Sequence, residues 1–382
     1  MLVLKTRLMA KSIKPKLLFV YPNQFGYLTD TYKYCEHLKD SYDINYICFD
    51  QGLERLVLPK VNVIYIPYNI GKVRRLLHFY GFLIQLTRKE KFEILFTVRF
   101  KFCFLISLFA RARIKILDYR SGDLSDNIFK RSLNNILMRF DALFFRHISV
   151  ISEGLRDMLR LNKDQTLILP LGADVFSDQS HSFDRLDLLY VGTLSLRNID
   201  QTIEGIALFL SKNKELSNLF SYTIIGFGNE QEEEKINTLI EQTGLNDTVR
   251  FAGRKKYTDL SAYFDDCNIG VCYVPITPYY EYQPVTKLFE YMLSGMPVIA
   301  TNTYENRLIV NGNNGVLIND SPEDFCKGLT RIYNQRNSYN SSEIRKSVES
   351  YTWKNIVSTN LKPYLQKLLS DYQLSETAAY RF

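Results

Sequence analysis

Short apolar segments alternate with longer stretches of helical periodicity along most of the chain. Between residues 16 and 169 the apolar runs predict strands, and helical patterns lie between most of them. We expect strands at residues 17–21, 44–48, 61–66, 94–98, 114–117, 143–151 and 166–169, and helices such as 31–39 and 74–88. Such alternation predicts a parallel sheet covered by helices.

A second series of the same kind begins near residue 186. Its predicted strands are residues 188–191, 222–225, 248–251, 269–274, 298–301 and 315–318. The polar residues 174–187 between the two series are typical of a linker. We therefore predict an α/β protein with two doubly wound, Rossmann-like domains facing each other across a cleft. Their bounds are residues 1–175 and 176–352, and residues 353–382 form a terminal helix that packs back toward the first domain.

Residues 284–300 form the most informative local pattern. Pro284 suits the first position of a helix, Lys287 and Glu290 share one helical face, and Gly295 ends the helix before a buried strand. The start of such a helix offers free N–H groups and the positive end of the helix dipole. This combination suits a sugar nucleotide, with its phosphates near the N–H groups and its ribose hydroxyls bonded to the carboxylate. The alternative is an ordinary surface pair, worth about 0.2–0.5 kcal/mol.

Composition narrows the class of protein. The chain has 382 residues, of which 46% are hydrophobic and 23% charged, as in soluble globular proteins. Its six cysteines lack C-x-x-C spacing, which indicates buried thiols in a reducing compartment. Residues 1–180 contain 28 basic and 17 acidic side chains, whereas the remainder is net acidic. A basic half favours nucleic acid or an anionic membrane as partner, and the absence of nucleic-acid-binding motifs argues against nucleic acid.

Membrane contact is therefore an open alternative. Residues 71–89 mix basic ends with aromatic and aliphatic side chains, which suits a membrane interface, or an ordinary helix packed on the first sheet. Residues 92–110 are apolar but interrupted by Arg99 and Lys101, so they do not predict a membrane span. The first 16 residues show no signal-peptide pattern. We expect a cytoplasmic protein, with peripheral contact to the inner face of the membrane left open.

Glycines and basic residues follow the predicted strands of the second series in a characteristic order. They are Gly192 and Arg197, Gly226 and Gly228, Gly253 and Arg254, and then the Lys287–Glu290 segment with its Gly-Met-Pro turn. The first half adds Ser-Glu-Gly at 152–154 and Pro-Leu-Gly-Ala-Asp at 170–174. This ordered set resembles the glycosyltransferases of family 4, the large group 1 set with the GT-B fold. The resemblance covers about residues 17–369.

The resemblance implies transfer of a sugar from a nucleotide-diphosphate sugar to a saccharide or lipid-linked saccharide, with retention at the anomeric carbon, in polysaccharide or glycoconjugate assembly. It places Arg197 and Lys287 on the departing diphosphate as catalytic cations. Glu290 would accept hydrogen bonds from the ribose. Gly192 and Gly226 would let the backbone approach the donor, and Arg254 would also bind it.

On the first domain, the loop containing Gly26 would form a wall of the cleft. Asp118 and Arg120 follow a predicted strand and would border the acceptor side, where Asp118 could take a proton. A structural Asp118–Arg120 pair is the alternative that we prefer. No D-x-D motif or metal-ligand spacing occurs, so we expect no metal ligands, a metal-independent reaction and no cofactor besides the donor.

The chain departs from the family pattern at two positions, so the identity of the donor sugar is not determined. Many members have a second glutamate where this chain has Tyr282, with Glu281 and Gln283 beside it, and Thr193 stands where many have arginine. The donor base and sugar, the acceptor, the linkage and the oligomeric state are not determined. A non-catalytic nucleotide-sugar-binding or partner protein on the same fold is the alternative function.

Overall fold

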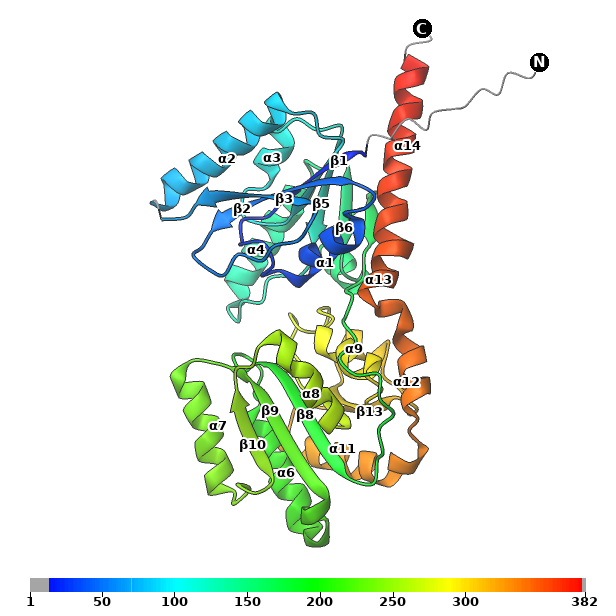
Figure 1. The fold of residues 1–382 in the computed structure, drawn as a ribbon. Coiled ribbons are helices and arrows are strands. Elements are labelled where there is room, and N and C mark those ends of the chain that lie inside the picture. The colour runs from blue at the N-terminus through cyan, green and yellow to red at the C-terminus, as the bar shows by residue number, and fades with distance from the viewer. Residues whose placement is uncertain (1–13, 70, 380–382) are drawn as a thin grey trace, which may run out of the picture.

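The computed structural model describes residues 14–69 and 71–379, and Figure 1 shows two domains with one helix running alongside the first. Each domain is built on a parallel sheet covered by helices on both faces. This confirms the predicted α/β fold with two doubly wound domains. The expectation of no signal peptide concerns residues that lie almost entirely outside the described part of the chain.

The first sheet has seven strands within the described residues, in the order β3-β2-β1-β4-β5-β6-β7. Its strands are β1 (Lys16–Val20), β2 (Asp43–Asp50), β3 (Val61–Pro67), β4 (Ile94–Val98), β5 (Ile114–Tyr119), β6 (His147–Val150) and β7 (Thr166–Ile168). The helices of this domain are α1 (Thr29–Leu38), α2 (Lys72–Lys89), α3 (Phe104–Phe109), α4 (Ile128–Ala142) and α5 (Glu153–Met158). Most strands are buried on both faces, because helices cover both sides of the sheet.

The second sheet has six strands within the same described residues, in the order β10-β9-β8-β11-β12-β13. They are β8 (Leu186–Thr193), β9 (Phe220–Phe227), β10 (Val249–Gly253), β11 (Ile269–Cys272), β12 (Val298–Thr301) and β13 (Gly315–Ile318). The helices are α6 (Asp200–Lys212), α7 (Glu230–Gln242), α8 (Leu260–Asp266), α9 (Thr286–Leu293), α10 (Tyr304–Arg307), α11 (Pro322–Gln335) and α12 (Ser341–Val348).

Helix ends in the second domain follow local sequence chemistry. Asn229 caps α7, and Glu232 completes a capping box by bonding back to the Asn229 backbone. Ser321 caps α11, which begins with Pro322. Gly295 follows α9 with a φ of 82°, a left-handed conformation that favours glycine, so the chain can turn directly into β12.

Several predicted boundaries are off by one or more residues, and two of them have a clear local cause. The strand expected at 143–151 begins only at His147, because α4 continues to Ala142 and Phe144 turns toward the aromatic rings of Phe104 and Phe140. Helix α9 begins at Thr286 rather than at Pro284, since Val285 has an extended backbone conformation. An apolar run marks burial, but it does not by itself mark where a strand starts.

The terminal helical segment packs on the first domain. It consists of α13 (Trp353–Asn355), a wider π-type turn at Ile356–Leu361, and α14 (Lys362–Ala379). Trp353, Ile356 and Leu361 belong to the core cluster that covers one face of the first sheet together with α1. Gly172 lies against Trp353, and a β-carbon at this position would come within 2.4 Å of the indole ring. The end of the chain therefore ties the second domain back to the first.

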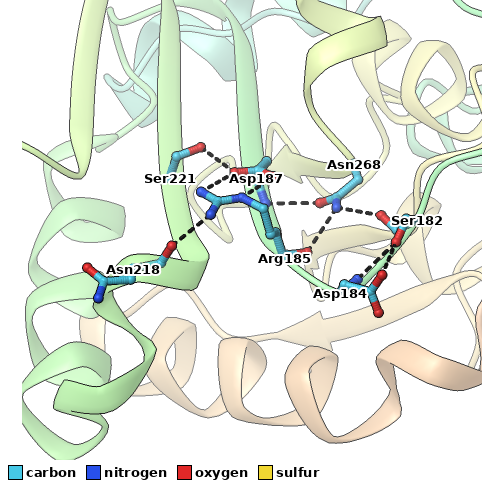
Figure 2. A network of polar contacts seen from close by, with 7 residues as sticks. All are labelled: Ser182, Asp184, Arg185, Asp187, Asn218, Ser221 and Asn268. Atoms are coloured by element: carbon cyan, nitrogen blue, oxygen red, sulfur yellow. Dashed lines mark hydrogen bonds and ion pairs between the residues drawn. The ribbon is translucent and has the colours of Figure 1, made fainter.

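A polar network fixes the end of the linker at the amino edge of the second sheet (Figure 2). Buried Asn268 accepts a hydrogen bond from the Asp187 backbone at 3.0 Å and donates to the carbonyls of Ser182 and Arg185. Asp187 accepts from Ser221 Oγ at 2.7 Å. The network satisfies polar groups where the chain enters β8, at the edge of the sheet opposite to the ends where α/β proteins bind ligands.

The structure also describes the cysteines and the length of the helices, for both of which the sequence led to expectations. All six cysteines are buried and free. Across the part of the chain that the structure describes, the helices lack the length and apolar character needed to cross a bilayer.

Candidate active site

A cavity of about 650 Å³ lies between the two domains. Most of its lining comes from the second domain, from the loops that follow β8 to β11 and from the start of α9. Thr29 and Leu124 line it from the first domain. The loops after β8 and β11 leave neighbouring strands whose connections run in opposite directions, which is where open α/β sheets bind ligands.

The residues predicted to bind or act on the donor all line this cavity. They are Gly192, Arg197, Gly226, Arg254, Lys287 and Glu290. The fold thus brings into one place side chains and glycines that the sequence spreads over four separate segments. Their individual roles stay predictions.

Arg197 lies in the β8–α6 loop, held by an unusual backbone. Its neighbours Leu196 and Asn198 have φ values of 58° and 50°, which are uncommon for residues other than glycine. Its Nη1 donates to the Tyr280 hydroxyl, and its guanidinium carbon lies 4.6 Å from the centre of the Tyr280 ring. Burial lowers the pKa of Arg197 from its ordinary value. The loop therefore presents a partly desolvated cation to the cavity, with a phenol rather than a carboxylate against it.

Lys287 projects from the first turn of α9. Its Nζ is buried, has no hydrogen-bond partner among the described residues, and lies 3.9 Å from the centre of the Tyr190 ring. Burial lowers the pKa of Lys287 to about 7, and the nearby charge of Arg197 acts in the same direction. A buried amine without a partner is costly unless something else pairs with it. An anion in the cavity would supply that partner.

The two glycines make room for this arrangement. A β-carbon at position 192 would lie 2.9 Å from Lys287 Nζ and 3.1 Å from the Tyr190 hydroxyl. A β-carbon at position 226 would lie 2.0 Å from the carbonyl oxygen of Gly192 on the neighbouring strand. Side chains at either position would displace the lysine or separate β8 from β9.

Glu290 lies one helical turn beyond Lys287. Burial raises its pKa to about 8; the nearby Asp174 carboxylate adds to this effect, whereas Lys287 opposes it. Asp174 forms an ion pair with Lys33 of the first domain at 2.8 Å and accepts a hydrogen bond from Tyr257. The carboxyl of Glu290 is thus partly shielded from water and available as a hydrogen-bond acceptor.

Arg254 forms the outer wall of the cavity together with Phe227. Its guanidinium carbon lies 4.8 Å from the centre of the Phe227 ring, and 46% of Phe227 is exposed. This wall offers flat surfaces to a planar ligand.

The first-domain candidates do not line the cavity with their side chains. Arg120 is buried, bonds Asp30 at 2.5 Å and the Leu169 carbonyl at 2.8 Å, and lies 3.8 Å from Asp118. Asp118 accepts from Ser149 Oγ at 2.6 Å, and burial raises its pKa to about 6. This geometry favours the structural interpretation of the Asp118–Arg120 pair. The carbonyl of Arg120 accepts a hydrogen bond from Gln283 of the second domain.

Gly26 also lies outside the cavity lining. Its φ of 91° is a left-handed conformation that favours glycine. Leu56 packs against it, and a β-carbon at position 26 would lie 2.5 Å from the Leu56 side chain. The turn at this position therefore requires glycine. The first-domain wall is formed instead by Thr29 and Leu124, which the sequence analysis did not select.

The sequence analysis also missed Tyr280 and left Gln283 without a role. Both line the cavity from the β11–α9 loop. Gln283 Nε2 donates to the Arg120 carbonyl across the domain boundary at 3.3 Å, whereas its Oε1 is buried without a partner among the described residues. Tyr282 packs instead against Tyr304 and Gly154, and Glu281 pairs with Arg307. The tyrosine-rich composition of this loop was its one visible signal.

The fold is that of a two-domain protein with a cavity between its domains, and comparisons with known proteins specify the class. The sucrose-phosphate synthase of Thermosynechococcus elongatus is 15% identical, with a TM-score of 0.73 over 94% of this chain and 100% of that one. HepE of Anabaena, solved in complex with UDP and glucose, is 14% identical, with a TM-score of 0.72 over 92% and 100%. A glycosyltransferase from Rickettsia africae is 14% identical, with a TM-score of 0.69 over 94% and 98%. The protein therefore has the GT-B fold.

Sequence comparison specifies the second domain further. Residues 185–335 match the family model of the glycosyl transferases group 1, which confirms the resemblance for that domain. No curated protein sequence matches the chain.

Proposed function

We propose that the protein is a retaining glycosyltransferase. It moves a sugar from a nucleotide-diphosphate sugar to a saccharide or lipid-linked saccharide, in the assembly of a surface polysaccharide or glycoconjugate. The observation that carries this proposal is the buried, unpartnered amine of Lys287, beside Arg197 and Glu290 in the cavity between the domains. The match of residues 185–335 to group 1 glycosyl transferases supports it.

In this proposal the cations act on the leaving group. Transfer of the glycosyl group leaves additional negative charge on the diphosphate, and fixed cations stabilise that charge most where water is excluded. Lys287 would gain an anionic partner, which would raise its pKa again. Arg197 would exchange its contact with Tyr280 for phosphate oxygens, which match its planar fork of donors.

The remaining lining residues would bind the other parts of the donor. Glu290 would accept hydrogen bonds from the ribose hydroxyls, and the nucleobase would lie along the wall formed by Phe227 and Arg254. Gln283 would contact the sugar, because its Oε1 is buried and lacks a partner among the described residues. We propose this residue for the position at which many family members use a second glutamate. We also propose that no metal ion takes part.

A thermal-shift screen against nucleotides and nucleotide sugars tests donor binding. We would start with UDP and UDP-sugars, because HepE is solved with UDP and with UDP-glucose. A ligand at about a hundred times its Kd stabilises the folded protein by about 2.7 kcal/mol, which raises the Tm by several degrees. The shift should become clearly smaller in Glu290→Ala and persist unchanged in Glu323→Ala, a control on α11. No shift with any donor would contradict the proposal.

Turnover separates the enzyme from the alternative of a non-catalytic binding protein. An enzyme should release the nucleoside diphosphate from the donor identified in the screen, at least by slow hydrolysis in the absence of acceptor. Binding without any release, also in the presence of acceptor extracts, would favour the alternative.

A further inference from the structure

The most unusual surface of the molecule is the solvent-facing side of α4. Seven large apolar residues are exposed there: Ile128, Phe129, Leu133, Ile136, Leu137, Phe140 and Leu143. Phe129 is 83% exposed and Leu143 is 80% exposed. Together these seven residues are called the α4 face below. Isolated exposed apolar residues are common, but a contiguous apolar face on one helix indicates an interaction site.

The buried side of α4 is more polar than its exposed side. Asn134 and Asp141 both point inward, together with Met138 and Ala142. Asn134 donates to Asp123 at 2.7 Å, and Asp141 pairs with Arg99 at 3.3 Å. A helix that only packed on the sheet would bury its apolar side, so the opposite orientation indicates that the α4 face has another partner.

The apolar surface continues onto α3. The ring of Phe104 lies 5.3 Å from that of Phe140 and 5.1 Å from that of Phe144, which joins the two helices. Leu108 follows one turn after Phe104 on α3 and is 53% exposed. By contrast, α2, for which the sequence left membrane contact open, has two large apolar side chains that are exposed, Val73 and Leu77.

Positive charge surrounds this surface. Lys101, Arg111, Lys130 and Arg146 are all exposed and lie at the ends of α3 and α4 or within them. Residues 100–147 contain four carboxylates, and only that of Asp126 belongs to an exposed residue. An apolar centre with a cationic rim complements an anionic lipid surface. Two copies of the same face would bring these cations together, which disfavours self-association through it.

The α4 face also adjoins the cavity between the domains. Leu124, which lines that cavity, lies only four residues before Ile128. The Tyr279 hydroxyl of the second domain donates to Asp126 at 2.6 Å, just before α4 begins. Figure 1 shows α14 along the side of the first domain away from α4. Leu368 and Asp371 of α14 line a pocket with Phe144 and Arg146 beyond the end of α4, so the terminal helix borders this surface but leaves the α4 face exposed.

We propose that the α4 face is a docking surface for an anionic phospholipid membrane, with Phe129, Leu133 and Ile136 entering the interface and the cationic rim on the lipid headgroups. Docking there places the mouth of the cavity close to the lipid, where an acceptor anchored in the membrane would be presented. The docking itself does not depend on the donor chemistry proposed above.

Vesicle sedimentation tests this proposal with the full-length protein. The probes are vesicles of phosphatidylcholine alone and vesicles of phosphatidylcholine with phosphatidylglycerol. The wild-type protein should partition onto the anionic vesicles and only weakly onto the zwitterionic ones. The variant Phe129→Ser/Leu133→Ser/Ile136→Ser should partition at least about tenfold more weakly. The matched control Val57→Ser/Leu308→Ser/Leu374→Ser removes three exposed apolar residues from other surfaces and should bind as wild type.

A second variant tests the charged rim. The variant Lys130→Ala/Arg146→Ala should partition several-fold more weakly onto anionic vesicles than the wild-type protein. Raised salt should weaken the partitioning of the wild-type protein in the same way. Equal partitioning of wild type and the triple variant would overturn the proposal. So would a wild-type dimer that the triple variant converts to a monomer without change in vesicle binding, because the partner would then be a second copy. The nucleotide-dependent thermal shift should be unchanged in these variants, so failure of docking is distinct from failure of the proposed enzyme activity.

Discussion

The two domains use charged residues beside the carboxyl ends of their strands in opposite ways. In the first domain, Arg120 is buried and bonded to Asp30 and the Leu169 carbonyl, with Asp118 nearby. In the second domain, Arg197 rests against a phenol, and Lys287 Nζ has no partner among the described residues. Paired charges hold the first domain together, whereas those of the second remain available for an anionic ligand. The two sets of charges thus differ above all in their partners.

The largest expected effect tests the structural side of this comparison. Arg120→Met should lower the free energy of unfolding by about 3–5 kcal/mol, because it leaves the buried Asp118 and the half-buried Asp30 without their cation. Arg197→Met, in the second domain, should change it by less than about 1 kcal/mol. Thermal and chemical unfolding of the two variants measure this difference. Equal destabilisation would mean that Arg197 is structural as well.

The second prediction concerns turnover. Lys287→Met or Arg197→Met should lower kcat about 10²–10³-fold, the usual cost of losing one preorganised charge from a transition state. Binding of the free nucleotide should weaken less than turnover. Initial-rate kinetics with the donor from the thermal-shift screen give both values. An equal loss in binding and turnover would assign these cations to ground-state binding only.

Removing the proposed ribose contact of Glu290 should reduce donor affinity by less than the loss of turnover predicted for the two cations. Glu290→Ala should weaken donor binding about tenfold to a hundredfold, because ribose hydroxyls lose a partially desolvated acceptor. Isothermal titration calorimetry measures the Kd. Asp174→Ala leaves the burial that raises the pKa of Glu290 and removes only the smaller contribution of the Asp174 carboxylate, so it should weaken binding less. Unchanged affinity in Glu290→Ala would place the ribose elsewhere.

The smallest effect is a proton uptake. Before a nucleotide binds, Lys287 has a pKa of about 7, so at pH 8 the amine is mostly neutral. Binding of a diphosphate favours the charged amine and should therefore take up a proton, and affinity should fall as the pH rises above about 7. Glu290, with a pKa of about 8, could release a proton in the same step and mask the uptake.

The variant Glu290→Gln removes that second group. Calorimetry of nucleotide binding at pH 8 in buffers of different ionisation enthalpy should show proton uptake in Glu290→Gln. The double variant Glu290→Gln/Lys287→Met should show none. The same uptake in both would assign it to a different group.

Much of the architecture could be predicted from the sequence. The predicted bounds of β4, β12 and β13 agree with the structure, because each strand is a short apolar run between a polar or glycine-containing turn and a helix. The donor-side residues followed from glycines and cations placed directly after strands. Where an apolar run continued across a helix end, as at Leu143, the boundary was predicted wrongly.

The remaining features depend on contacts between distant segments. Gln283 and the Arg120 carbonyl are 163 residues apart, and Tyr280 and Arg197, which are in contact, are 83 residues apart. The apolar side of α4 could not be recognised either, because periodicity defines a face but not which face meets the sheet. For this reason the sequence offered residues 71–89, and not α4, as the candidate for membrane contact, with an ordinary packed helix as the alternative.

A structure of the protein with a bound nucleoside diphosphate tests the central claim most directly. The account predicts that the terminal phosphate lies within about 3 Å of both Arg197 and Lys287, with the ribose hydroxyls on Glu290. A nucleotide bound outside the cavity between the domains, or bound inside it with both cations turned away from the phosphates, would contradict the account.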